Sequence, residues 1–150
     1  MKRIRSLVWL LPIVLIVVAC NKTDRYNNIL VKGHTWKIYD EETEVNTDVL
    51  TSCLVVDQSS FDNQDEFGSA TWRHTDGSEQ SVTWRFWRAA STFEFWHQGD
   101  LDQGSRASLQ SYYRSGIYDV ISLSNTEIVI QSEETIGYEG KMITITIIRG

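Results

Sequence analysis

Residues 67–88 read FGSATWRHTDGSEQSVTWRFWR, and this stretch decides the fold prediction. Aromatic and β-branched residues alternate with polar ones on both sides of Asp76-Gly77, a dipeptide that suits the type I′ turn of a two-stranded hairpin. An even loop at this turn pairs Ser69 with Trp84 and places Trp84 on the core face. The same register places Trp72 and Trp87 on the opposite, solvent-facing side.

The next turn extends the pattern. If Ala89-Ala90 form the bend, Phe86 lies opposite Phe93 and Trp84 lies opposite Phe95. Cross-strand aromatic pairs contribute about 0.2–1 kcal/mol each beyond alanine, so this ladder is the predicted centre of the core. Ala-Ala is a poor two-residue turn, and a longer loop or a bulge is the alternative.

Short alternating runs separated by turn signals recur along the rest of the chain, and no segment after the N-terminal region has a sustained helical period. Eight antiparallel strands in about 120 residues predict an all-β, up-and-down barrel rather than a sandwich, because a barrel has no exposed edges. Gln98–Gln110 and Glu41–Asp48 are expected to be long loops, with a short helix at Ser105–Gln110 as an alternative. The predicted strands are Thr35–Tyr39, Cys53–Asp57, Phe67–Thr75, Gln80–Arg88, Thr92–His97, Ser111–Leu123 (or a shorter strand broken at Gly116), Glu127–Gln131 and Met142–Arg149.

The first twenty residues have the pattern of a secretory signal: a basic start at residues 2–5, an apolar run at residues 7–19, and then Cys20. The apolar run is shorter than the ~20 residues of a membrane-spanning helix and contains Pro12. Val17-Val18-Ala19-Cys20 resembles the lipobox of bacterial lipoproteins, with Val17 in place of the usual leucine. That resemblance implies removal of residues 1–19 and acylation of Cys20. Residues 20–31 are then a lipid-anchored tether and residues 32–150 the barrel domain.

The net charge limits the kinds of binding partner that are expected, and the number of cysteines limits the disulfides that can form. Three of the 14 basic residues precede Cys20 and all 20 acidic residues follow it, so residues 20–150 carry a net charge of −9. A negative domain does not favour nucleic acid or an anionic membrane surface. With Cys20 acylated, Cys53 is the one remaining thiol, so no intramolecular disulfide forms, and a buried inert thiol is its expected state.

The stretch Gly33-His34-Thr35-Trp36 resembles the Gly-x-Trp motif of lipocalins and of bacterial lipocalin-like lipoproteins, with one extra residue between Gly33 and Trp36. Residues 115–130 also resemble the penultimate hairpin of those lipoproteins. The resemblance implies that Trp36 plugs the closed end of the barrel and that an arginine near the last strand, here Arg149, lies across it.

The sequence carries no recognisable catalytic or metal-binding motif. His34, His74 and His97 lack the spacing of a metal site. No serine has a nucleophile-elbow context and no glycine-rich phosphate loop is present. Neither an enzyme nor a cofactor is therefore predicted.

Two function hypotheses remain, both for a lipid-anchored protein of the bacterial cell envelope. In the first, Trp84, Phe86, Phe93 and Phe95 line a cavity for a small hydrophobic ligand, although the same side chains also suffice to fill an eight-stranded barrel. In the second, Trp72 and Trp87 form a contact surface for an envelope protein, one version being inhibition of a cationic enzyme. Burial of these two side chains under a loop such as Gln98–Gln110 is the alternative to a contact surface. Asn21 follows Cys20 instead of the aspartate of inner-membrane lipoproteins, so the resemblance implies the outer membrane.

Overall fold

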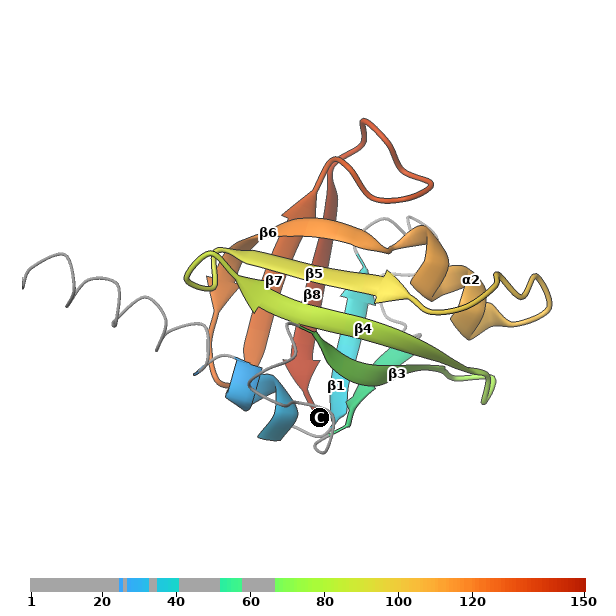
Figure 1. Cartoon of the computed structure of the whole chain (residues 1–150), viewed down its shortest axis with the longest axis horizontal. Coiled ribbons are helices and arrows are strands. Elements are labelled where there is room, and N and C mark those ends of the chain that lie inside the picture. Colours follow the sequence, from blue (N-terminus) through green and yellow to red (C-terminus); the bar gives the residue numbers. More distant parts are fainter. Residues whose placement is uncertain (1–24, 26, 33–34, 41–51, 58–66) are drawn as a thin grey trace, which may run out of the picture.

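The computed structural model describes residues 25, 27–32, 35–40, 52–57 and 67–150, and these form a closed antiparallel β-barrel (Figure 1). Each strand pairs with the next in sequence, and β8 closes the barrel against β1. The predicted eight-stranded, up-and-down, all-β barrel is thus confirmed. The strands are β1 (Thr35–Asp40), β2 (Ser52–Val56), β3 (Gly68–His74), β4 (Glu79–Trp87), β5 (Thr92–His97), β6 (Gly116–Leu123), β7 (Glu127–Ser132) and β8 (Ile143–Arg149).

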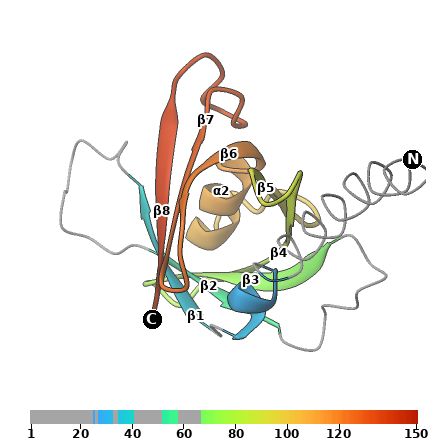
Figure 2. The ribbon, with the colours of Figure 1, turned by 90° about the vertical axis from the view of Figure 1, so that its left-hand side faces the viewer.

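The barrel has two different ends, which Figure 2 shows in a second view. The helical residues 27–32, the start of β1, the turns at residues 88–91 and 124–126 and the end of β8 lie at one end, here called the N-terminal end. The opposite end, here called the α2 end, carries helix α2 (Arg106–Tyr113), the β3–β4 turn and the loop at residues 133–142.

Alternation along the strands fills the barrel interior. Apart from Ser132 at the end of β7, the inward side chains of β7 and β8 are isoleucines, as their sequence alternation suggests, and Ile128, Ile130 and Ile143 have no exposed surface. The inward side chains of β3 to β6 are largely aromatic, including Trp72, Trp84, Phe86, Phe93, Phe95 and Tyr118. One continuous hydrophobic core results.

The predicted register of β3 against β4 was wrong by one residue. Ser69 pairs with Thr83 and Arg73 with Glu79, leaving an odd loop of residues 74–78 between the last paired residues. Gly77 adopts a φ of +87° and its N–H donates to the carbonyl of His74, as in a type I turn followed by a left-handed glycine. A one-residue slip exchanges the two faces of a strand, so Trp72 points into the barrel and not toward solvent.

The predicted register of β4 against β5 is confirmed. Trp84 pairs with Phe95, and Phe86 pairs with Phe93. The loop contains four residues rather than two, which is also even and therefore keeps the same faces aligned. Arg88, Ala89 and Ala90 all have φ between 50° and 62°, a left-handed turn that alanine does not signal in a sequence.

Helix α2 replaces the start of the predicted strand Ser111–Leu123, and β6 begins only at Gly116. The hydroxyl of Ser105 accepts a hydrogen bond from the N–H of Ser108 at 3.2 Å, which caps the helix. The alternative of a short helix in the Ser105–Gln110 stretch was therefore the correct one, and the helix continues to Tyr113.

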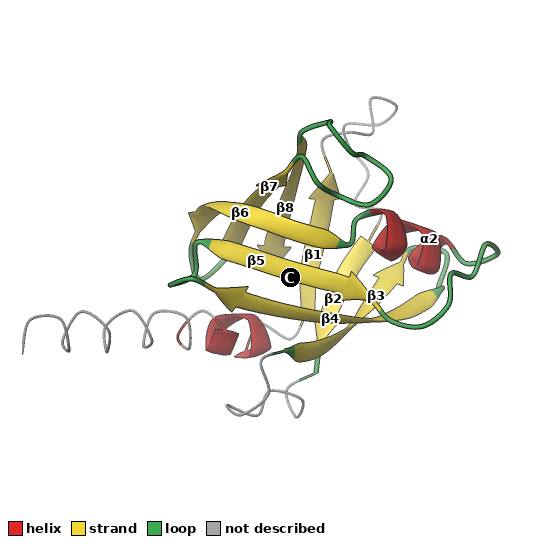
Figure 3. Ribbon diagram, turned by 45° about the horizontal axis from the view of Figure 1, so that its top comes forward, coloured by secondary structure: helices red, strands yellow, loops and turns green. Residues whose placement is uncertain are grey.

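Residues 27–32 are helical and pack against the barrel (Figure 3). Leu30 is completely buried, and its carbonyl accepts a hydrogen bond from the indole of Trp36 at 2.9 Å. The side-chain oxygen of Asn27 accepts a hydrogen bond from the backbone N–H of Phe86 at 3.1 Å. Residues 27–31, which the prediction assigns to the tether, thus contact the barrel.

Candidate functional site

The four aromatic residues predicted to line a ligand cavity lie together in the core. Trp84, Phe86, Phe93 and Phe95 are each no more than 4% exposed. The rings of Phe86 and Phe93 lie 4.8 Å apart, and Phe95 stacks on Trp72 at 5.4 Å and on Tyr118 at 6.1 Å. These separations are those of packed aromatic pairs.

Gly68 shows how tightly the Trp84 ring is enclosed. A methyl group placed on Gly68 meets Cε2 and Cζ2 of Trp84 at 2.6 Å. The indole N–H of Trp84 also donates to the carbonyl of Ser69 at 3.3 Å. The indole therefore occupies the space beside β3, and a glycine is required under it.

Helix α2 covers the other side of this aromatic cluster. The Oε1 atom of Gln110 accepts a short hydrogen bond from the Ser52 hydroxyl, which in turn accepts one from the indole N–H of Trp72 at 3.0 Å. At the next residue of the helix, the hydroxyl of Ser111 lies 2.9 Å from Nδ1 of His97. These bonds join α2 to β2, β3 and β5 and hold it over the barrel.

Trp36 and Arg149 are neighbours at the N-terminal end. They are paired residues on β1 and β8, and Trp36 has no exposed surface. The guanidinium of Arg149 is exposed and donates to the carbonyl of Lys32 at 3.5 Å. The structure thus brings both residues to one end of the barrel, and their closing role stays a prediction.

Trp87 lies on the outer face, as predicted, whereas Trp72 is only 3% exposed and the prediction of a surface role for it was wrong. The guanidinium of Arg88 stacks over the Trp87 ring at 4.1 Å, and that of Arg85 lies 5.2 Å from it. Arg85 also forms an ion pair with Glu94 at 3.0 Å. Trp87 is therefore half-buried under cations.

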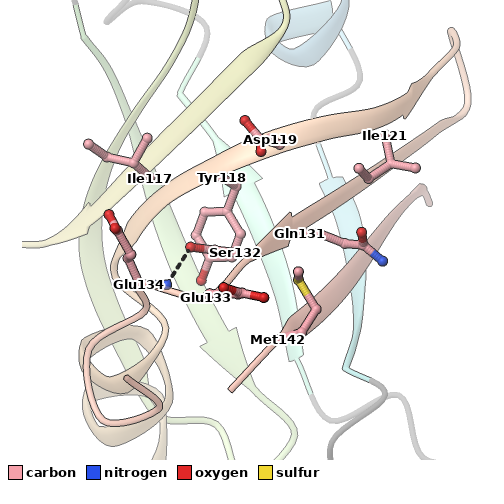
Figure 4. A pocket seen from close by; sticks show the side chains of 9 residues that line it. All are labelled: Ile117, Tyr118, Asp119, Ile121, Gln131, Ser132, Glu133, Glu134 and Met142. Carbon is pink, nitrogen blue, oxygen red and sulfur yellow. Dashed lines mark hydrogen bonds between the residues drawn. The ribbon is translucent and has the colours of Figure 1, made fainter. Parts of the chain in front are cut away.

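A groove of about 370 Å³ opens further round the same outer face, where β6 and β7 separate (Figure 4). The last paired residues at this point are Asp119 and Gln131, so residues 116–118 have no partner on β7. A bulge between Val120 and Ser122 leaves Ile121 57% exposed. The groove is lined by Ile117, Tyr118, Asp119, Ile121, Gln131, Ser132, Glu133, Glu134 and Met142.

The chemistry of this acid-rimmed groove is both apolar and anionic. Ile117, Ile121 and Met142 are 42–57% exposed, which is high for large apolar side chains. The carboxylates of Asp119, Glu133 and Glu134 are exposed beside them, and no lysine or arginine of the described part of the chain lines the groove.

Backbone hydrogen bonds fix the segment that forms one wall of the groove. The Ser132 hydroxyl accepts from the N–H of Glu134 at 3.0 Å, the bond drawn in Figure 4. The N–H of Gly140 donates to the carbonyl of Glu133 at 3.0 Å. The positions of Glu133 and Glu134 are therefore set by the loop's own hydrogen bonds.

Sequence reasoning did not identify this groove. Its signals in the sequence are the interruption of alternation at Val120-Ile121-Ser122 and the two adjacent carboxylates of Glu133-Glu134. Neither signal indicates that β6 and β7 separate, because the separation arises where residues 116–118 of β6 pair with β5 alone.

The remaining reactive groups do not assemble into a site within the described residues. No group of three histidine, cysteine or acidic side chains there is placed to hold a metal ion. Burial raises the pKa of the Cys53 thiol, which lies half-buried on β2. Cys20 and His34 lie outside the described residues.

Comparison with protein-family models, with curated proteins and with solved structures finds no match to this chain. Among the helices in the described part of the chain, none has the length and apolar character to cross a membrane.

Proposed function

We propose that this chain is a lipid-anchored, lipocalin-like protein of the bacterial cell envelope that binds a basic segment of a partner protein along the acid-rimmed groove. It works as a non-catalytic interaction module, attached to the membrane through acylated Cys20. We propose the outer membrane as its location, because Asn21 follows Cys20 instead of the aspartate of inner-membrane lipoproteins.

The observation that carries this proposal is the contrast between the packed interior and the open outer groove. Trp84, Phe86, Phe93 and Phe95 line none of the grooves of about 310, 370 and 460 Å³ found on the described residues. The packed aromatic core favours the interaction hypothesis over a ligand held among these four side chains.

The lining of the groove supports a basic partner. Exposed apolar side chains such as Ile121 and Met142 suit the aliphatic stem of a lysine or arginine, while Glu133 and Glu134 suit its charged group. A negative groove also attracts a cationic protein over several ångströms and raises its association rate. An inhibitor of a cationic enzyme remains one form of such a module.

Photocrosslinking in cells tests the proposal with the full chain. A photoreactive amino acid is placed at Ile121 or Met142, and at Ser81 on the exposed outer face of β4 as a control. We expect a partner adduct from the two groove positions and none from Ser81, with the crosslinked partner peptide carrying a net positive charge.

Charge reversal separates a specific contact from general proximity. Glu134→Lys is expected to abolish the adduct, whereas Glu127→Lys, at the other end of β7, is expected to leave it intact. An adduct that survives Glu134→Lys, or one to an acidic peptide, would refute the groove as the binding site.

The ligand hypothesis has its own measurement. Tryptophan fluorescence is titrated with fatty acids and small aromatic probes at low micromolar concentration. A saturable change that disappears in a folded Trp84→Ala variant would overturn the proposed packed-core module. Mass spectrometry of the N-terminal peptide tests acylation of Cys20 independently.

A further inference from the structure

A second groove, of about 460 Å³, lies at the N-terminal end of the barrel and is basic. Arg25, Lys32 and Arg149 are exposed there, and among the described residues none that lines the groove is acidic. Within the described residues these three cations form no ion pair. The groove is lined by Arg25, Asn28, Ile29, Lys32, Asn125 and Arg149.

This basic groove has a fixed place relative to the start of the folded domain. The helical residues 27–32 are held to the barrel by the bonds from Trp36 to Leu30 and from Phe86 to Asn27. Cys20 precedes Arg25 by five residues, which span at most about 18 Å even when fully extended. An acyl anchor on Cys20 therefore keeps the N-terminal end within that distance of the lipid surface.

Charge is distributed unevenly between the two ends. The described segments at the N-terminal end carry Arg25, Lys32, Arg88 and Arg149, with Asp57 and Glu127 at the neighbouring strand ends. The turn and loops at the α2 end carry mostly carboxylates. They include Asp76, Asp100, Asp102, Glu133, Glu134 and Glu139, against Lys141 in the loops and Arg106 and Arg114 on and after helix α2.

We infer that the basic groove binds the anionic headgroups of the membrane to which the chain is anchored. The inference rests on the proposed acyl anchor at Cys20. It modifies the expectation from composition that a domain with a net charge of −9 avoids an anionic membrane. Screening limits electrostatic attraction to about 8–10 Å, so the charges nearest the lipid decide the contact.

The contact adds orientation to the attachment that the anchor provides. Each basic group near an anionic surface contributes about a fivefold preference, so three of them contribute about a hundredfold. With the N-terminal end on the headgroups, the acidic α2 end points away from the membrane. Repulsion between its carboxylates and the anionic headgroups favours the same orientation.

Lysine labelling of the full chain on vesicles tests the inference. The protein is added to vesicles of phosphatidylcholine alone or of phosphatidylcholine with phosphatidylglycerol, and treated with a water-soluble amine-acylating reagent. We expect the acylation rate of Lys32 to fall several-fold on the anionic vesicles only. The rate at Lys141, at the other end of the barrel, serves as an internal control.

Charge-reversal variants give the matched comparison. Arg149→Glu changes the local charge by two units and is expected to weaken the docking equilibrium about 25-fold, restoring labelling of Lys32. Arg25→Glu, on the exposed face of the helical segment, is expected to act in the same direction if Arg149→Glu perturbs folding. Arg106→Glu makes the same change on α2 and is expected to have no effect.

The outcomes separate this inference from the proposed anchor. Flotation with neutral vesicles reports the anchor alone. Flotation without any difference in Lys32 labelling between the two vesicle types would overturn headgroup binding and leave the anchor in place. Protection of Lys32 on anionic vesicles without flotation on neutral ones would support headgroup binding and refute the anchor. Protection by inorganic phosphate in the absence of anionic lipid would identify a free-anion site and overturn membrane docking.

Discussion

Replacing Gly68 with alanine tests whether the barrel interior is packed or has free space. The new methyl group meets two carbons of the Trp84 ring at 2.6 Å, which is about 1 Å closer than the usual carbon–carbon contact of about 3.5–4.0 Å. Trp84 has no exposed surface and is held at its indole N–H, so its ring cannot move aside without displacing neighbours.

Overpacking of this kind costs about 1–3 kcal/mol, and the lower entropy of the unfolded alanine chain offsets about 0.5 kcal/mol of it. We therefore expect the free energy of unfolding of Gly68→Ala to fall by about 0.5–2.5 kcal/mol. For a domain of this size that corresponds to a Tm lower by roughly 2–15 °C. Thermal unfolding followed by circular dichroism and urea denaturation measure the two quantities.

Gly116→Ala is the matched control, because Gly116 is also a buried strand glycine. A methyl group there meets its nearest neighbours, the carbonyl of Glu134 and Cα of Thr135, at 3.4 and 3.5 Å, which is ordinary contact. We expect this variant to be as stable as the parent or slightly more stable. Equal stability of the Gly68→Ala and Gly116→Ala variants would refute the reasoning, since it would mean that Trp84 has room to move and that the barrel can accept a ligand.

Three further predictions concern single side chains. Ser105→Ala removes the α2 cap that accepts from Ser108, and the free energy of unfolding measured in urea is expected to fall by about 0.5–2 kcal/mol. Hydrogen bonds donated by the hydroxyl and N–H of Ser78 lower the pKa of the exposed Asp76 carboxyl to about 2. Since the folded pKa lies below the unfolded value of about 3.9, the stability contributed by Asp76 is complete above about pH 4 and lost as the pH falls through about 2. Asp76→Asn is expected to flatten the unfolding free energy over that range, and an unchanged pH profile would contradict this. Burial raises the pKa of Cys53, so its alkylation by iodoacetamide near pH 8 is expected to be slower than that of a free cysteine; an equal rate would contradict this.

The strand pattern was predictable from the sequence because alternation of apolar and polar residues directly reflects a sheet with one buried face. The pairing of Trp84 with Phe95 was predictable because a two-residue and a four-residue loop centred at Ala89-Ala90 give the same register between β4 and β5. The inward position of Trp72 was not predictable, because Asp76-Gly77 is compatible with both a two-residue turn and a turn with a glycine bulge.

Helix α2 was predicted only as an alternative and without its last turn, and the acid-rimmed groove was not predicted at all, because both depend on contacts distant in sequence. The helix has no acidic residue in its first turn and no basic residue in its last turn, so its main local signal was the cap at Ser105. Its position is set by the hydrogen bond that Gln110 accepts from Ser52 of β2 and by the one between Ser111 and His97 of β5. The groove exists because the first residues of β6 pair with β5 but not with β7. The sequence of one strand does not indicate which of its two neighbours it pairs with at a given residue.

The length of the barrel sets the distance between the two proposed binding surfaces, the basic groove and the acid-rimmed groove. The basic groove includes Asn125 and Arg149 at one end of β7 and β8, and the acid-rimmed groove includes Ser132 and Met142 at the other end. Strand β7 has six residues, which correspond to about 20 Å at the usual rise of a strand. Because barrel strands are tilted by about 40°, a barrel docked by its N-terminal end would hold the part of the groove around Ser132 and Met142 about 15 Å from the headgroups. That distance exceeds the screening length, so the attraction of the groove for a basic partner would be independent of the charge of the membrane. Loss of docking would therefore change the height and orientation of the groove and leave its intrinsic affinity for the partner unchanged.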